Sequence, residues 1–139
     1  RDLASAGADI IAVDATDRPR PESLESAIQA IRAAGALSMA DCSCIDDGKN
    51  ASRLGVDILA STMAGYTTQT TPEGPDLELV RKLATLGKPV IAEGRYHSPG
   101  LAVEAVKAGA DAVVVGTAIT RAEVVTGWFL TALKSSELA

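Results

Sequence analysis

Acidic and hydroxyl-bearing side chains follow the ends of several short apolar runs in this chain. The clearest run spans residues 89–92 and leads directly into Glu93, Gly94 and Arg95. It is too short for a helix and has the composition of a strand buried on both faces, as in a parallel sheet. In parallel α/β folds the loops after the carboxyl ends of the strands hold the ligand site. Glu93 is therefore a candidate for catalytic proton transfer, and the alternative is a solvated loop glutamate.

The other apolar runs end in residues of the same kinds. The four further predicted strands span residues 10–13, 37–40, 58–61 and 112–115. The ends of the five strands supply Asp14, Asp41, Ser61, Glu93 and Gly116. Because the carboxyl ends of parallel strands meet at one rim, we expect an acid-rich, hydroxyl-rich mouth there.

Two glycine-containing pairs follow the last two predicted strands, namely Gly94-Arg95 and Gly116-Thr117. Glycine lets ligand oxygens approach backbone amides, and a helix amino terminus just downstream favours an anion. In barrels of this type the phosphate site often lies in these two loops. The position of both pairs, directly after the last two strands, predicts that these four residues bind a phosphate.

The elements that position these residues repeat along the chain. Helix-ending glycines recur at Gly7, Gly35, Gly55, Gly87 and Gly109, and an apolar strand follows each almost at once. Three of these junctions share the pattern Gly-x-Asp, which we interpret as recurrent turn chemistry with glycine at the helix end. Five βα units without a hairpin signal predict an α/β fold with a parallel sheet.

The helices between these strands are predicted from apolar spacing. One spans residues 21–34, with a stripe through Leu24 and Ile28 and with Pro21 in its first turn. Further helices are predicted over residues 46–54 and 76–86. Another starts near Ser98, and a final helix closes the chain. Residues 62–75 form a long loop, which predicts either part of a sugar-sized site or a mobile lid.

The composition suits short buried strands covered by alanine-rich helices. Of the 139 residues 47% are hydrophobic and 3% aromatic, which fits one domain over residues 1–139. The net charge of -5, without a basic cluster, argues against nucleic acid and anionic membrane as partners, and no apolar run approaches membrane-spanning length. Cys42 and Cys44 are too few for a zinc site and favour a reducing, cytoplasmic setting.

Several competing interpretations carry less weight. Asp14, Asp41 and Glu93 have the oxygen ligands that magnesium prefers, but similar acids occur in barrels without metal, so no metal site is predicted. His97 is expected to be structural or exposed to solvent, and Cys42 lacks a nearby histidine that would make it a nucleophile. Trp128 and Phe129 are expected to pack rather than to stack on a ligand.

Five phrases of the chain closely resemble the bacterial N-acetylmannosamine-6-phosphate 2-epimerase family. They lie at residues 13–16, 39–43, 61–67, 91–96 and 115–121 and so extend over nearly the whole chain. The phrases AEGR and STMAGYT are fairly specific to that family, whereas VVVGTAITR is shared with other phosphate-binding barrels.

The resemblance implies a (βα)8 TIM barrel that converts N-acetylmannosamine 6-phosphate to N-acetylglucosamine 6-phosphate in sialic acid breakdown, without a cofactor. In the family a lysine and a glutamate from different strands move the C2 proton, and the glutamate matches Glu93. Asp41 matches a substrate-contacting aspartate, and Arg121 matches an arginine at the sugar phosphate. A C–H beside an aldehyde can be removed when the enolate oxygen is stabilised and a base is positioned away from water.

The chain departs from the family in having five predicted strands. Its lysines fall in helices or at the wrong ends of strands, and the family's lysine would lie before Arg1. We therefore expect the carboxyl-terminal five βα units of the barrel, which are inactive alone and associate as a homo-oligomer through unpaired strand edges. Rival interpretations are a thiamine-phosphate-synthase-like enzyme and an inactive module that binds sugar phosphates.

Overall fold

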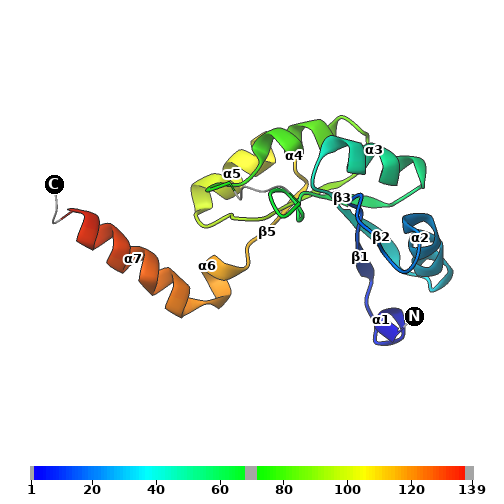
Figure 1. The fold of residues 1–139 in the computed structure, drawn as a ribbon, viewed down its shortest axis with the longest axis horizontal. Coiled ribbons are helices and arrows are strands. Elements are labelled where there is room, and N and C mark those ends of the chain that lie inside the picture. Colours follow the sequence, from blue (N-terminus) through cyan, green and yellow to red (C-terminus); the bar gives the residue numbers. More distant parts are fainter. Residues whose placement is uncertain (1, 68–71, 137–139) are drawn as a thin grey trace.

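A single parallel sheet organises the computed structural model, which describes residues 2–67 and 72–136 (Figure 1). Its strands are β1 (Ile10–Asp14), β2 (Leu37–Asp41), β3 (Ile58–Ala60), β4 (Val90–Glu93) and β5 (Ala112–Val114). They lie in the order β1-β2-β3-β4-β5, and every neighbouring pair is parallel. The predicted series of five βα units is confirmed, and the strand ends shift by about one residue, as is usual for boundaries.

One helix precedes β1, and helices follow each strand. They are α1 (Asp2–Ser5), α2 (Leu24–Ala33), α3 (Ile45–Arg53), α4 (Leu77–Ala84), α5 (Pro99–Lys107), α6 (Thr117–Thr120) and α7 (Ala122–Ser136). Helix α4 contacts both α3 and α5, and α2 contacts β1 and β2. Figure 1 shows α3, α4 and α5 side by side over the sheet, whereas α7 leads away from it.

The start of α2 differs from the prediction. The helix begins at Leu24, and the hydroxyl of Ser23 caps it by accepting a hydrogen bond from the Ser26 amide at 3.1 Å. Pro21 therefore lies before the helix, so its predicted place in the first turn is wrong. Arg20, whose guanidinium binds the carbonyl oxygens of Asp14 and Thr16, holds the preceding segment in an irregular loop.

The end of the chain also differs from the prediction. Residues 117–120, which were expected in the segment between the last strand and the final helix, form the short helix α6, and a backbone break at Arg121 (φ -125°, ψ 77°) separates it from α7, the expected final helix. Phe129 on α7 is 67% exposed, so the prediction that it packs is wrong within the described part of the chain, whereas Trp128, although 41% exposed, contacts the ring of His97. The reason is geometric, since the principal contacts of α7 are with α6 and not with the sheet.

The repeated Gly-x-Asp junctions have a common structure. After α3, Gly55 adopts φ +82° and donates to the Ser52 carbonyl, while the next amide, Val56, donates to Ala51. This double hydrogen bond is the Schellman ending that glycine permits. The carboxylate of Asp57 then accepts the Ser38 amide and hydroxyl at 2.8 and 2.7 Å. The junctions at Asp57 and Asp111, whose carboxylate accepts the Val90 amide at 2.8 Å, therefore end a helix and fasten the next strand to its neighbour.

The two faces of the sheet differ in burial. Alternate residues such as Ala40, Leu59 and Val90 are fully buried beneath the helices. On the opposite face Ile10 and Leu37 are 44% and 49% exposed. Because strand side chains alternate between faces, Asp41 lies on the same face as Leu37 and so does Glu93, through the pairings of β2, β3 and β4. The candidate acids thus share the open face.

Within the described ranges, no helix is both long and apolar enough to cross a membrane. Four residues of the predicted loop 62–75, residues 68–71, lie outside the described part of the chain.

Close packing of α3 against α4 generates a stability prediction. A Cβ added to Gly48 would lie 2.4 Å from the fully buried side chain of Leu83 and 3.2 Å from that of Leu86. Gly48→Ala should therefore lower the free energy of unfolding by about 1–3 kcal/mol. Gly127→Ala is the matched control, since that Cβ meets nothing within 4 Å and should stabilise α7 by about 0.5–1 kcal/mol. Urea unfolding measures both, and equal effects would contradict the packing argument.

Candidate active site

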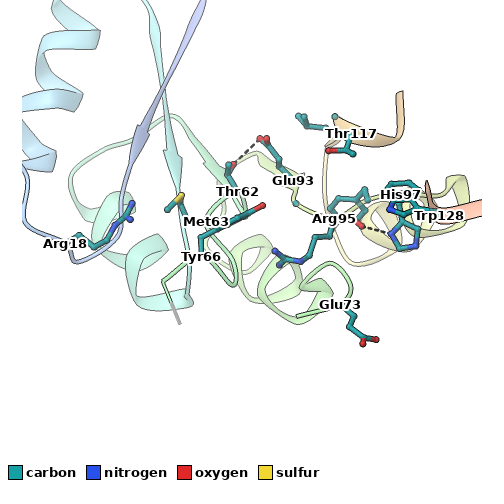
Figure 2. Close-up of a pocket in the computed structure, with 14 residues that line it drawn as sticks. Arg18, Thr62, Met63, Tyr66, Glu73, Glu93, Arg95, His97, Thr117 and Trp128 are labelled. Atoms are coloured by element: carbon teal, nitrogen blue, oxygen red, sulfur yellow. Dashed lines mark hydrogen bonds between the residues drawn. The ribbon is translucent and has the colours of Figure 1, made fainter. Parts of the chain in front are cut away.

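A cavity of about 980 Å³ opens where the strands end at their carboxyl termini (Figure 2). Its walls come from the loops after β3, β4 and β5, together with one residue from the loop after β1 and one from α7. The lining residues are Arg18, Thr62, Met63, Tyr66, Glu73, Glu93, Gly94, Arg95, Tyr96, His97, Val114, Gly116, Thr117 and Trp128. Of the predicted site residues, Glu93, Gly94, Arg95, Gly116 and Thr117 are among them.

Glu93 is held by Ser61 and Thr62, the two residues that follow β3. The fully buried hydroxyl of Ser61 accepts a hydrogen bond from the Glu93 amide at 3.0 Å and donates one to the Glu93 carbonyl at 2.9 Å. The hydroxyl of Thr62 donates to carboxylate atom Oε2 at 3.1 Å, a contact drawn in Figure 2. Both the backbone and the side chain of this half-buried glutamate therefore have fixed partners, as a proton-transfer group requires.

Asp41 lies at the end of β2, two strands away from Glu93, and is half-buried. Burial raises the pKa of its carboxyl group, the Thr62 hydroxyl acts in the opposite direction, and the negative charges of Glu93 and Asp14 raise it further. Its buried atom Oδ1 has no hydrogen-bond partner within the described part of the chain. Asp41 does not line the cavity directly, but its unsatisfied oxygen is suited to accept a hydrogen bond from a ligand hydroxyl or amide.

Asp14 is occupied by local contacts. The backbone amide and hydroxyl of Thr16 donate to Oδ1 at 2.9 and 2.6 Å, and Arg18 pairs with Oδ2. Burial alone would raise the pKa of Asp14, but these contacts outweigh it and lower the pKa. Its role is thus to shape the β1 loop, and this places Arg18 at the cavity wall.

Arg95 holds the long loop. Its Nε and Nη2 donate to the carbonyls of Gly74 and Ala64, both at 2.8 Å, and its guanidinium lies 5.6 Å from the ring centre of Tyr66. The backbone of Arg95 has φ +63°, which is uncommon for a residue other than glycine. The guanidinium therefore fixes both ends of the described loop against the cavity, while its buried Nη1 has no partner among the described residues.

The predicted phosphate-binding residues divide into two groups. Gly116 and Thr117 line the cavity at the start of α6. Arg121 lies beyond the end of this short helix, is exposed, and pairs through Nε with Glu123 at 2.8 Å. Arg121 as a phosphate ligand therefore stays a prediction.

Several lining residues were not predicted. Arg18 enters the wall because Asp14 and Thr16 direct it there, a tertiary effect that no local pattern reports. His97, exposed as predicted, contacts Trp128 edge to face with ring centres 5.7 Å apart, and its Nδ1 donates a hydrogen bond to the Arg95 carbonyl at 3.0 Å. A histidine and a tryptophan 31 positions apart gave no sequence signal for this contact.

Other candidate chemistries find no structural support. Across residues 2–67 and 72–136, no group of three or more His, Cys, Asp or Glu side chains is arranged to hold a metal ion. Burial raises the pKa of the Cys42 thiol to about 12, with the charge of Asp47 adding to the effect. Such a thiol is protonated at neutral pH and is a poor nucleophile.

Comparison with known proteins decides the family. The model of the family described as "Putative N-acetylmannosamine-6-phosphate epimerase" matches residues 1–135. The chain belongs to this family. A relative from Yersinia pestis (strain Pestoides F), named "Putative N-acetylmannosamine-6-phosphate 2-epimerase", is 56% identical over 135 residues, which make up 97% of this chain and 58% of the relative.

Solved structures place the chain within the same epimerase family. The N-acetylmannosamine-6-phosphate 2-epimerase from Clostridium perfringens superposes with a TM-score of 0.90 at 38% identity, covering 94% of this chain and 59% of that one. A thiamine phosphate pyrophosphorylase from Pyrococcus furiosus gives a TM-score of 0.66 at 25% identity, covering 88% and 56%. The thiamine-related interpretation is therefore not favoured. The consecutive parallel strands and the superposition on the Clostridium perfringens epimerase confirm five βα units of a TIM barrel.

The chain spans a little under 60% of the length of these epimerase relatives. The activity and substrates of the whole protein are accordingly proposals.

The raised pKa of Asp41 predicts a pH-dependent stability difference. Folded Asp41 binds its proton more tightly than the unfolded chain does, so this residue lowers the free energy of unfolding as pH rises from about 4 through the raised pKa. Asp41→Asn has no titrating carboxyl group at this position and therefore removes this pH-dependent fall in the free energy of unfolding. The free energy of unfolding of the variant, minus that of the parent, should increase with pH over this window and then level off. Urea unfolding from pH 3.5 to 7 measures it, and a constant or falling difference would contradict the assignment.

Proposed function

We propose that the protein carrying this sequence interconverts N-acetylmannosamine 6-phosphate and N-acetylglucosamine 6-phosphate by removing and returning the proton on C2. One observation carries the proposal, namely that Glu93 projects from a strand end into the cavity with its backbone and carboxylate both fixed. The names of its relatives support the choice of substrate.

The chemistry requires a base beside a C–H bond that lies next to the aldehyde of the open-chain sugar. When the base takes the C2 proton, the electron pair of that bond forms the enolate, and a proton returned to the opposite face inverts C2. Glu93 is one of the two groups required. Among the described residues the cavity wall holds no lysine, so the second group, which the resemblance gives as a lysine, is expected from a part of the barrel other than these five units.

Asp41 and the β5 loop supply the proposed substrate contacts. The unsatisfied Oδ1 of Asp41 would accept a hydrogen bond from the sugar. Gly116 and Thr117 would hold the phosphate, since the first turn of α6 leaves amide N–H groups without partners in the helix. Gly94 allows the ligand close to the backbone, where its φ of +108° favours glycine. Arg95 acts mainly through the loop that it fixes.

Two further expectations stay predictions. A cofactor is not expected, because proton transfer of this kind needs none. Association of identical chains is expected through the free edges of β1 and β5, the outer strands of the described sheet.

Replacing the proposed base tests the function. In the full-length enzyme, Glu93→Gln should slow exchange of the C2 proton with solvent deuterium by about 10²-fold or more, while substrate affinity and fold are kept. Glu104→Gln on the exposed side of α5 is the control and should exchange at the parent rate. Exchange near the parent rate in Glu93→Gln would remove Glu93 from the reaction. Substrate binding by the parent protein without any exchange would favour the inactive sugar-phosphate module.

Binding of phosphorylated and plain sugars tests the phosphate contacts. Thr117→Val and Arg121→Gln should each weaken binding of the 6-phosphate, by roughly 10-fold for one lost hydrogen bond to a charged group, and should leave binding of the unphosphorylated sugar nearly unchanged. Thr131→Val on α7 is the control, since its hydroxyl bonds to the Gly127 carbonyl of its own helix. Isothermal titration calorimetry measures each affinity, and equal losses for both sugars would place the phosphate elsewhere.

A further inference from the structure

Thr62 stands between the two half-buried acids of the site. It is the second residue after β3, and β3 lies between β2, which ends in Asp41, and β4, which ends in Glu93. Its hydroxyl donates to Oε2 of Glu93 at 3.1 Å. In Figure 2 the two side chains point toward each other, whereas Glu73 points away from the group.

We infer that Thr62 is a positioning residue that fixes the carboxylate of Glu93 for proton transfer at C2 of the substrate. The inference rests on the proposed function and extends it to a residue that makes no bond to the reacting atoms. By holding Oε2, the hydroxyl leaves Oε1 as the oxygen that takes and returns the proton.

The carboxylate needs such a partner because its last torsion is intrinsically loose. Rotation about the terminal bond of a glutamate side chain has no sharp energy minima, so its orientation is set by contacts. Ser61 fixes the backbone of Glu93 but does not contact its carboxylate. The Thr62 hydroxyl supplies the missing constraint, and Thr62 is itself secured because Ala64 caps the turn by donating to the Ser61 carbonyl at 3.0 Å.

The nearby charge of Asp41 makes the constraint more important. Burial is the main cause of the raised pKa of Asp41, and the negative charge of Glu93 adds to it, because the two acids repel each other when both are ionised. Without a donor between them, the Glu93 carboxylate would turn away from Asp41 and lose its alignment. The Thr62 hydroxyl has one proton, which it donates to Glu93, and it also lies near enough to Asp41 to lower the pKa of that carboxyl group.

Thr62→Val tests the inference, because it keeps the branched shape and deletes the hydroxyl. The rate of C2 proton exchange should fall on the order of 10- to 100-fold, the range for one hydrogen bond to a charged group, with the substrate dissociation constant changed far less. Thr62→Ser keeps the hydroxyl and should restore most of the rate. Thr85→Val at the exposed end of α4 is the control, and circular dichroism confirms that each variant is folded.

A double-mutant cycle separates positioning from a general structural effect. If Thr62 acts through Glu93, then adding Thr62→Val to Glu93→Gln should slow exchange little beyond Glu93→Gln alone. Three outcomes would each overturn the inference while leaving Glu93 in place. The exchange rate of the double variant could fall by the product of the two single losses, or Thr62→Ser could exchange as slowly as Thr62→Val. Alternatively, Thr62→Val could weaken substrate binding without slowing exchange. Absence of exchange in the parent protein would instead reject the proposed function and this inference with it.

Discussion

The parallel pairing of β3 with β2 on one side and β4 on the other is the constraint on which the site depends. In that register Asp41 pairs with Ala60, and Ala60 pairs with Ile91, two residues before Glu93. A shift of one residue in the pairing of β4 with β3 would turn Glu93 to the helix-covered face, away from Asp41. The register is secured at the opposite edge, where Asp57 binds the Ser38 amide and Asp111 binds the Val90 amide at 2.8 Å. The chemistry at the carboxyl ends of the strands thus relies on hydrogen bonds at their amino-terminal ends.

Much of this arrangement could be predicted because it follows from local rules. Gly55 and Gly109 indicate helix ends because few other residues adopt their positive φ. Apolar runs between such glycines are strands, and whatever follows them lies at the ligand-binding edge. That reasoning found Glu93, Gly94, Gly116 and Thr117 without any tertiary information.

The remaining features depend on contacts between distant residues. Arg18 reaches the cavity wall through its pairing with Asp14, and Arg95 turns to the carbonyls of the β3 loop instead of to the open cavity. A guanidinium can satisfy either carbonyls or a phosphate, and its residue type alone does not distinguish them. The break at Arg121 and the exposure of Trp128 likewise depend on what α7 finds to pack against.

Ser61 binds the backbone of Glu93 and not its side chain, through one hydrogen bond accepted and one donated. The location of residue 93 is therefore independent of which side chain it carries. During evolution, a substitution at this position can change the reactive group without moving the strand end or the loops beside it. A fold that separates placement from reactivity in this way can acquire new chemistry by single replacements, which is consistent with the many unrelated reactions that barrels of this kind support.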